Sequence, residues 1–332
     1  MSRALIIAEV GVNHNGDINN AKELIIAASN CGADIVKFQS FKTEKLVTAL
    51  AQKTKYQIEN TNKFSITQKD MLSRLELTDK DHQVLFEFSR KNKIEFLSTA
   101  FDIESLQMLL DLGIKRIKIP SGEITNLPYL RKISSINLPI ILSTGMSNIN
   151  EIKDALNVLI KSGTKKNNIT IMHANTEYPT PMSDVNLRSM ISIGKKFNVN
   201  FGYSDHTLGF EVSIAAAALG AKCIEKHFTL NRNMKGPDHK ASLEPKELNE
   251  MVYAVRNIEI ALGSRVKKPS KSEISNIKIV RKSLVASRNI KRGEIFTEQN
   301  LTSKRPGNGL SPFKIIKFLG KRSLKNYKKM NK

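Results

Sequence analysis

Residues 200–228 read NFGYSDHTLGFEVSIAAAALGAKCIEKHF and contain one complete strand–helix–strand unit. The apolar runs Asn200–Ser204 and Lys222–Phe228 are predicted strands, and Phe210–Leu219 between them has a helical pattern. Strands that alternate with helices are typical of a parallel sheet covered by those helices. This unit therefore indicates an α/β fold.

The same alternation runs through most of the chain. Eight strands are predicted, at Ala4–Val10, Asp34–Gln39, Glu95–Ala100, Arg116–Pro120, Pro139–Thr144, Ile169–Ala174, Asn200–Ser204 and Lys222–Phe228. Helical patterns include Asn20–Cys31, Asp79–Asn92, Ile103–Leu112, Ile149–Lys161, Phe210–Leu219 and Pro245–Leu262. Eight βα units in this length predict a (β/α)8 TIM barrel. A doubly wound open sheet is the alternative, and the lack of a GxGxxG pattern after the first strand disfavours it.

Three regions differ in character. We expect a catalytic barrel at 1–265, a linker at 266–282 and a small β-rich domain at 283–332. Within the barrel, the polar segment Ser40–Thr78 follows the second strand and shows little periodicity. Loops of this kind usually lie over the active face of a barrel, so we expect this one there too.

The composition narrows the classes of protein that fit. Cys31 and Cys223 lie far apart, which indicates neither a disulfide framework nor a metal knuckle. The first apolar run is interrupted at Glu9, and no stretch approaches the roughly 20 apolar residues that a membrane span needs. We therefore expect a cytoplasmic protein that does not enter a membrane.

The net charge of +22 is concentrated near the C-terminus. Val266–Lys332 holds 19 Lys and Arg against 3 Asp and Glu, whereas the preceding 265 residues hold 34 against 28. A basic segment of this kind can bind nucleic acid, form a solvated surface or steer anionic substrates. The absence of Trp and of interleaved aromatic residues disfavours nucleic acid.

Polar residues gather at the C-terminal ends of the predicted strands, where TIM-barrel enzymes carry their chemistry. His206 and His227 end successive strands, so they can share a metal ion. Lys37 and Lys118 interrupt apolar strands, and we expect both to face an anionic ligand because an unpaired buried ammonium is costly. A half-exposed strand is the plainer explanation for the two lysines.

Carboxylates occupy some of the same strand ends. Glu9 and Glu123 can serve as general acid or base, although spacing alone does not assign those roles. Glu225 lies two residues before His227, so both side chains face the same way. The simpler interpretation of Glu225 is an ion-pair partner for a lysine inside the barrel.

Eight segments, in chain order, resemble the sialic acid synthase family. They are Ala8–Gly16 (AEVGVNHNG), Val36–Gln39 (VKFQ), Lys118–Glu123 (KIPSGE), Leu142–Met146 (LSTGM), Glu177–Pro181 (EYPTP), Tyr203–Thr207 (YSDHT), Glu225–Thr229 (EKHFT) and Gly236–His239 (GPDH). In the tail, Lys282–Ala286 and Lys304–Gly309 are similar to the antifreeze-like (SAF) domain of these enzymes. The resemblance covers essentially the whole chain.

This resemblance implies an enzyme that condenses phosphoenolpyruvate with an N-acylated mannosamine-type sugar. It implies that phosphoenolpyruvate is bound by Lys37, Lys118, Ser121, Ser143, Thr176 and Ser204. It implies sugar contacts from Gln39, Tyr178, Asp238 and Arg305, the last reaching the partner's site in a domain-swapped homodimer. His206 and His227 would hold a divalent metal, typically Mn²⁺, with Mg²⁺ or Co²⁺ as alternatives. Glu9 and Glu123 remain the catalytic candidates.

Some assignments stay open. Thr176 stands where many family members have a phosphate-contacting asparagine, and Asn175 is adjacent; the sugar contact of the second loop falls on Asn60 or Asn62. Within the family, the segments look most similar to bacterial N,N'-diacetyllegionaminate synthases, with N-acetylneuraminate synthase as the alternative and pseudaminate synthase third. A nucleic-acid-binding protein and a metal-dependent pyruvate aldolase are the hypotheses from other classes.

Overall fold

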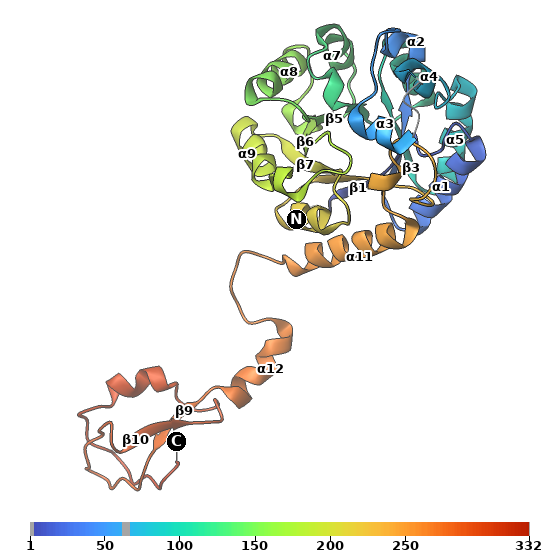
Figure 1. Cartoon of the computed structure of the whole chain (residues 1–332). Coiled ribbons are helices and arrows are strands. Elements are labelled where there is room, and N and C mark those ends of the chain that lie inside the picture. Colours follow the sequence, from blue (N-terminus) through green and yellow to red (C-terminus); the bar gives the residue numbers. More distant parts are fainter. Residues whose placement is uncertain (1–2, 62–66, 332) are drawn as a thin grey trace. The chain divides into compact units, whose positions relative to one another are not determined.

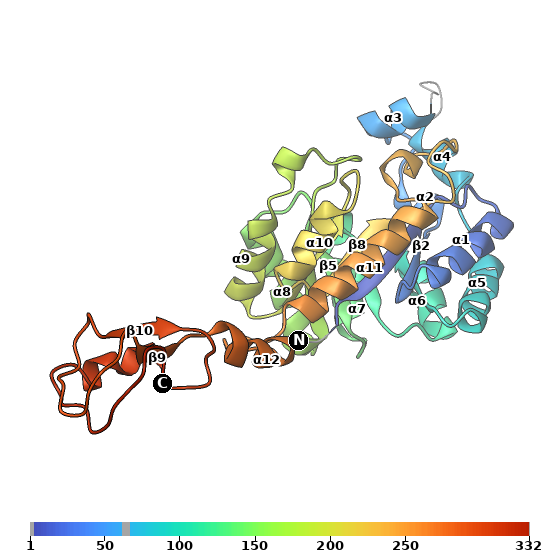
Figure 2. The ribbon, with the colours of Figure 1, turned by 90° about the horizontal axis from the view of Figure 1, so that it is seen from below.

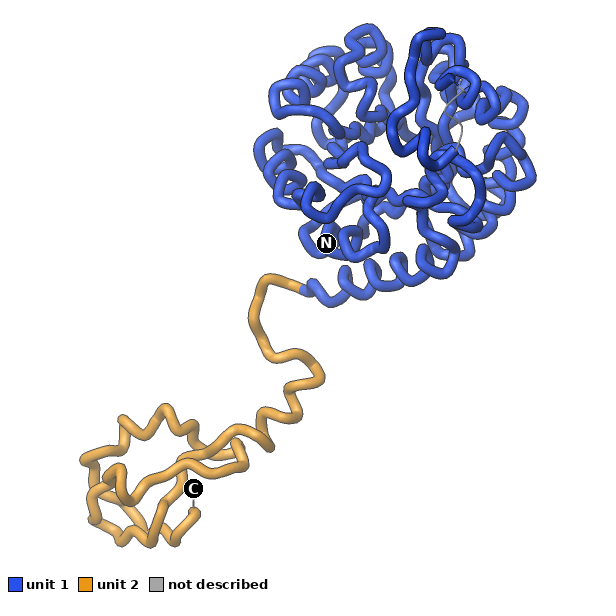
Figure 3. The backbone as a smooth tube through the Cα atoms, in the orientation of Figure 1, with its two compact units in different colours: residues 1–263 blue, residues 264–332 orange. Residues whose placement is uncertain are grey.

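The computed structural model describes residues 3–61 and 67–331, which form two compact units, 1–263 and 264–332 (Figure 3). In the first unit, eight parallel strands pair in chain order and close into a barrel, with helices around it (Figure 1). The strands are β1 Leu5–Gly11, β2 Ile35–Ser40, β3 Glu95–Ala100, β4 Ile117–Ile119, β5 Ile140–Ser143, β6 Ile169–Ala174, β7 Asn200–Asp205 and β8 Cys223–His227. The predicted TIM barrel is confirmed, and each predicted strand overlaps an observed one.

All six predicted helices are also found. The helices of this unit are α1 Ile18–Asn30, α2 Thr43–Leu46, α3 Lys55–Thr61, α4 Gln68–Ser73, α5 Asp79–Lys91, α6 Ile103–Leu112, α7 Leu127–Ser134, α8 Ile149–Lys161, α9 Leu187–Phe197, α10 Glu211–Ala218 and α11 Pro245–Ala261. Capping boxes begin α5 at Thr78 and α8 at Asn148. Gly113 ends α6 in the left-handed conformation, with φ 86°.

The segment 40–78, predicted as a loop, contains the three short helices α2, α3 and α4. Figure 2 shows them together at the end of the barrel away from the N-terminus. They begin at weak local signals, such as the capping box at Thr67, and bury few residues. No apolar stripe of helical period marks them, because such short helices do not need one.

The barrel interior explains why polar residues stand inside apolar strands. Six buried residues fill the lower barrel: Ile7, Ile35, Leu97, Ile141, Met172 and Cys223. Side chains two positions apart on a strand face the same way, so the next inward layer is Glu9, Lys37, Thr99, Ser143, Ala174 and Glu225. The alternate residues pack outward against the helices in a much larger apolar cluster. The polar layer therefore lies on top of a packed apolar layer.

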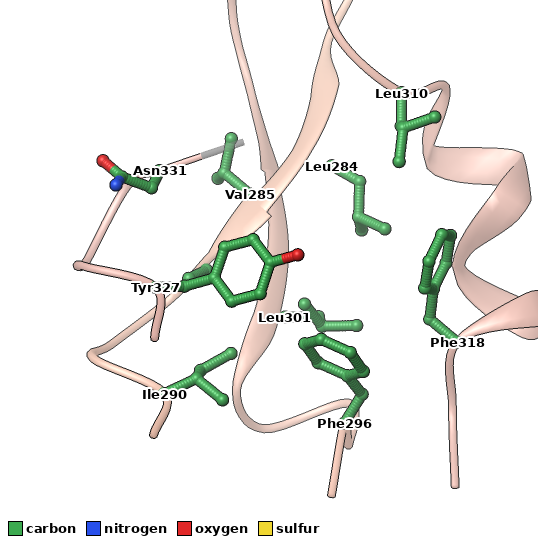
Figure 4. Close-up of a pocket in the computed structure, with 10 residues that line it drawn as sticks. Leu284, Val285, Ile290, Phe296, Leu301, Leu310, Phe318, Tyr327 and Asn331 are labelled. Atoms are coloured by element: carbon green, nitrogen blue, oxygen red, sulfur yellow. The ribbon is translucent and has the colours of Figure 1, made fainter. Parts of the chain in front are cut away.

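The second unit is small and has its own core. It contains α12 Lys271–Val280, the antiparallel pair β9 Ser283–Ala286 and β10 Leu301–Lys304, and a 3₁₀ helix at Pro312–Lys317. In Figure 4, apolar side chains of this unit converge around a small cavity of about 40 Å³. The range expected to be a linker, 266–282, includes the helix α12.

Among the described residues, no helix is long and apolar enough to cross a membrane.

Candidate active site

A cavity of about 200 Å³ opens at the C-terminal ends of the barrel strands. Eleven of the fourteen residues that were assigned a catalytic, binding or metal role from the sequence line it: Glu9, Lys37, Gln39, Lys118, Ser121, Ser143, Thr176, Tyr178, Ser204, His206 and His227. Glu225 lines it as well, on the same side of β8 as His227. The strand register brings these residues together, since Glu9 pairs with both Lys37 and His227 across neighbouring strands.

Lys118 lies at the centre of a buried ionic network. Its Nζ lies 3.0 Å from Glu225 Oε1 and donates to Ser143 Oγ at 2.8 Å. Ser204 Oγ donates to the same Glu225 oxygen at 2.8 Å. Burial lowers the pKa of Lys118, and Glu225 opposes that shift. The lysine therefore faces the pocket but does so as part of an ion pair, as the simpler interpretation of Glu225 required.

Lys37 bridges the two carboxylates of the network. Its Nζ lies 2.8 Å from Glu9 Oε2 and 3.4 Å from Glu225 Oε2, and it donates to Thr99 Oγ1 at 3.0 Å. Burial would lower the pKa of Lys37, but Glu225 and Glu9 outweigh it and raise that pKa. Two ammonium groups and two carboxylates thus share one buried space.

The two carboxylates of this network titrate in opposite directions. Burial raises the pKa of Glu9 to about 7, with the negative charge of Glu225 adding to the shift and Lys37 opposing it. For Glu225, burial acts the same way, but Lys118 and Lys37 outweigh it and lower the pKa. Glu225 therefore carries the charge that holds the lysines, while Glu9 can exchange a proton near neutral pH.

The histidines present nitrogen atoms suited to a metal. The carbonyl oxygen of Asn175 can only accept, so His206 Nδ1 carries the proton and Nε2 keeps its lone pair. Because the Ser204 hydroxyl donates its hydrogen bond to Glu225, the Tyr178 hydroxyl is the donor to Nε2, at 3.0 Å. Burial lowers the pKa of His206 to about 4 and that of His227 well below its ordinary value, which keeps both rings neutral.

The residues present fit a divalent ion held by two protein ligands. The His206 and His227 ring centroids are 5.4 Å apart, and His227 Nδ1 is buried without a hydrogen-bond partner. Among the described residues, no group of three or more His, Cys, Asp or Glu could hold a metal. Any ion here would complete its coordination with oxygen atoms from substrate or water.

Two family models and several known proteins match this chain. The NeuB family model matches residues 24–267, and the SAF domain model matches residues 281–329. The chain belongs to the NeuB family. It is 56% identical over 328 residues to the N,N'-diacetyllegionaminic acid synthase of Campylobacter jejuni, covering 99% of this chain and 98% of that protein. The synthase of the same name from Legionella pneumophila is 44% identical, covering 96% and 89%.

A solved structure is also similar to this chain. The crystal structure of N-acetylneuraminic acid synthetase from Leptospira borgpetersenii superposes with a TM-score of 0.74 at 32% identity, covering 83% of this chain and 90% of that one. The family predicted from eight short segments and the SAF domain predicted from the two tail segments are therefore both confirmed.

Three residues that the NeuB-family resemblance implicates do not line the cavity. Glu123 is half-buried in a 3₁₀ helix and accepts a hydrogen bond from Asn126 at 2.5 Å. Asp238 is buried, and its burial raises its pKa to about 7. Arg305 belongs to the second unit and is exposed there.

The structure describes three of the four residues between which the sequence left a choice. Thr176 lines the cavity, whereas the Asn175 side chain accepts from the Glu177 N–H. Asn60 Nδ2 donates to the Pro237 carbonyl at 2.6 Å, and Asn62 lies outside the described residues. A phosphate contact at this point would therefore fall on Thr176.

Two contributors were missed from sequence. Thr99 supports Lys37, and the register that pairs it with Lys118 could not be read from the strand itself. Tyr56, in α3, stacks on Tyr178 with ring centroids 5.1 Å apart. An aromatic residue in a polar, poorly periodic segment was the only signal available for it.

Replacing Asp238 with asparagine should stabilise the NeuB barrel at pH 8 more than at pH 4. Because the folded pKa lies above the unfolded one, the wild type loses stability as pH rises from about 4 to about 7. The asparagine cannot ionise, so it avoids that loss, which is of the order of a few kcal/mol. Urea unfolding of both proteins across this range measures it. Asp154→Asn, at an exposed position on α8, is the control; a variant difference that does not change with pH would contradict the expectation.

Proposed function

We propose that this chain is an N,N'-diacetyllegionaminate synthase. It would condense phosphoenolpyruvate with 2,4-diacetamido-2,4,6-trideoxymannose, consume water and release phosphate. The observation that carries this proposal is 56% identity to an enzyme of that name over nearly the full length of both chains. The cavity supports the anionic co-substrate, since Lys37 reaches it from β2 and Lys118 from β4.

The cavity residues have the chemistry to bind phosphoenolpyruvate. Lys37 and Lys118 would offset the charge of its carboxylate and phosphate, and Ser121, Ser143 and Thr176 would donate hydrogen bonds. Because Glu225 neutralises part of the lysine charge, the free site avoids two uncompensated buried cations. The ligand-free network would therefore pair its buried charges and still present ammonium groups to an anion.

A divalent metal, Mn²⁺ as first choice, would be held by His206 and His227. Bound there, it would polarise the aldehyde of the open-chain sugar. Asn175 fixes the His206 tautomer through its carbonyl, which aims Nε2 into the cavity. The Tyr178 hydroxyl is hydrogen-bonded to His206 Nε2. When the metal binds that nitrogen, the hydroxyl would be free to bond the sugar instead.

Glu9 is the group we assign to proton transfer. Carbon C3 of phosphoenolpyruvate would bond to the aldehyde carbon, and the aldehyde oxygen would take up a proton and become a hydroxyl. Water would add at C2, and Glu9, with its pKa of about 7, would accept the proton that this water loses, which balances the proton taken up by the aldehyde oxygen. The C–O bond from C2 to phosphate would then break, phosphate would leave with the proton of the C2 hydroxyl, and the ketone would form. Glu123 lies outside the cavity lining, so we give it no part in these steps.

The remaining parts of the proposal concern the assembly. Arg305 would reach the sugar's N-acyl group from the partner subunit in a domain-swapped homodimer. The basic SAF domain would then act at an active-site rim and bind no nucleic acid. Reduced, unpaired cysteines fit the cytoplasm as its compartment.

The test is phosphate release from phosphoenolpyruvate with added Mn²⁺. N-acetylmannosamine and the 2,4-diacetamido-6-deoxy sugar are supplied separately, and pyruvate replaces phosphoenolpyruvate in a third assay. We expect release that requires a sugar and is faster with the diacetamido sugar. Faster release with N-acetylmannosamine would favour neuraminate synthesis, and condensation from pyruvate would favour an aldolase. No release in metal-replete, folded protein would contradict the proposal.

A further inference from the structure

A stack of three rings connects the second βα segment to the active site. Tyr178 lies between Tyr56 and His206, with ring centroids 5.1 Å and 4.1 Å away and interplanar angles of 26° and 24°. The His227 ring is nearly perpendicular to the Tyr178 ring, with an interplanar angle of 85° and ring centroids 5.2 Å apart. Both faces of the Tyr178 ring are therefore covered, one by a predicted metal ligand and the other by α3.

The helix that carries Tyr56 is held over this position. Asn60, on the same helix, donates to the Pro237 carbonyl at 2.6 Å. The next residue, Asp238, is buried, and its charge acts on both tyrosines: burial raises their pKa values and Asp238 raises them further. Helix α3, Tyr178 and Asp238 thus meet at one side of the cavity.

We propose that Tyr56 is a positioning residue for the sugar, acting through Tyr178. Its ring holds Tyr178 against His206 and so fixes the cavity wall on the side where the sugar is expected. The proposal rests on the function proposed above and deepens it, because it makes α3 part of the sugar site. Phosphoenolpyruvate binding, which falls on Lys37 and Lys118, should not depend on it.

The contacts give this role to the ring of Tyr56 and not to its hydroxyl. That hydroxyl is hydrogen-bonded to Thr54 and, weakly at 3.5 Å, to Gln57 Nε2, which both belong to its own segment, so these bonds do not reach Tyr178. The ring, in contrast, lies within the range in which aromatic pairs attract beyond simple burial. Phenylalanine should therefore preserve the effect, whereas alanine should remove it.

The experiment compares Tyr56→Ala and Tyr56→Phe with the wild type in steady-state kinetics. We expect Tyr56→Ala to raise the KM for the sugar roughly tenfold, while the KM for phosphoenolpyruvate changes less than about twofold. Tyr56→Phe should restore the wild-type sugar KM. In a Tyr178→Ala background, removing Tyr56 should have little further effect, because the two rings act as one unit.

Two control variants separate positioning from general destabilisation. Lys55→Ala removes a side chain that is 86% exposed on the same helix, and Tyr253→Ala removes a tyrosine that is 69% exposed on α11. Both should leave every constant unchanged. Parallel shifts in the two KM values, or a Tyr56→Phe variant as impaired as Tyr56→Ala, would overturn the proposal.

Calorimetric titration with the sugar keeps this question separate from the reaction itself. If the wild type releases no phosphate, the proposed function fails. Sugar binding to wild type and Tyr56→Ala still decides the positioning role: weaker binding to Tyr56→Ala supports it. Equal binding, or no binding to either protein, overturns it.

Discussion

Replacing Lys118 with methionine is expected to lower the rate of phosphate release at least about 100-fold. The ammonium lies 3.0 Å from Glu225 and bonds Ser143, so it holds the centre of the cavity and faces the expected anion. Methionine fills similar space without the charge. The measurement is phosphate release at saturating sugar, with the KM for phosphoenolpyruvate determined alongside.

The matched control for this variant is Lys115→Met. Lys115 lies three residues earlier, is exposed, and lies outside the cavity lining. Its replacement should change the rate less than about twofold. Circular dichroism of both variants checks that the barrel is folded. A folded Lys118→Met protein that keeps half of the wild-type rate would refute the assigned anion site.

Replacing Glu225 with glutamine is expected to destabilise the ligand-free barrel by about 3–5 kcal/mol. Glu225 is the shared partner of Lys118, Lys37 and Ser204. Without its charge, Lys118 loses the carboxylate that it contacts, and Glu9, which pairs with Lys37, is left to offset two buried ammonium groups. Urea unfolding at pH 7 measures the loss.

The Glu225 variant also tests whether the network is built around an anion. Added inorganic phosphate should recover part of the lost stability, because a bound anion supplies the missing negative charge. Glu87→Gln is the control: Glu87 is half-exposed and pairs with Arg90 at 3.2 Å, so its loss should cost at most about 1 kcal/mol. Equal losses for the two variants, or no response to phosphate, would contradict this account.

The barrel itself could be predicted because its signals are local. Strands such as Glu95–Ala100 and Ile169–Ala174 match their predicted bounds, since β-branched and aromatic residues and flanking polar residues mark both ends. Helix α12 and helix α3 were missed for the opposite reason. Neither buries a full apolar stripe, so neither leaves the periodic pattern from which helices are predicted.

The composition of the site was also predictable, but its pairing was not. Polar residues in and just after the apolar strands pointed to the barrel mouth, and eleven of the fourteen residues assigned from the strand ends and the family resemblance line one cavity. Which carboxylate holds which lysine depends on strand register and on closure between β1 and β8. Glu9 and Glu225 look alike in sequence, yet their pKa values shift in opposite directions because only Glu225 contacts both lysines.

The sequence alone thus determined the (β/α)8 architecture, the family and the residues at the strand ends, because each is encoded within a few neighbouring positions. Only the tertiary structure decided that Lys37 and Lys118 are neutralised by a shared Glu225, that Glu123 lies outside the cavity, and that Tyr56 stacks on Tyr178. Those contacts join residues far apart in the chain. They depend on the register of the strands and on the position of the second βα segment. Neither can be predicted from a pattern of neighbouring residues.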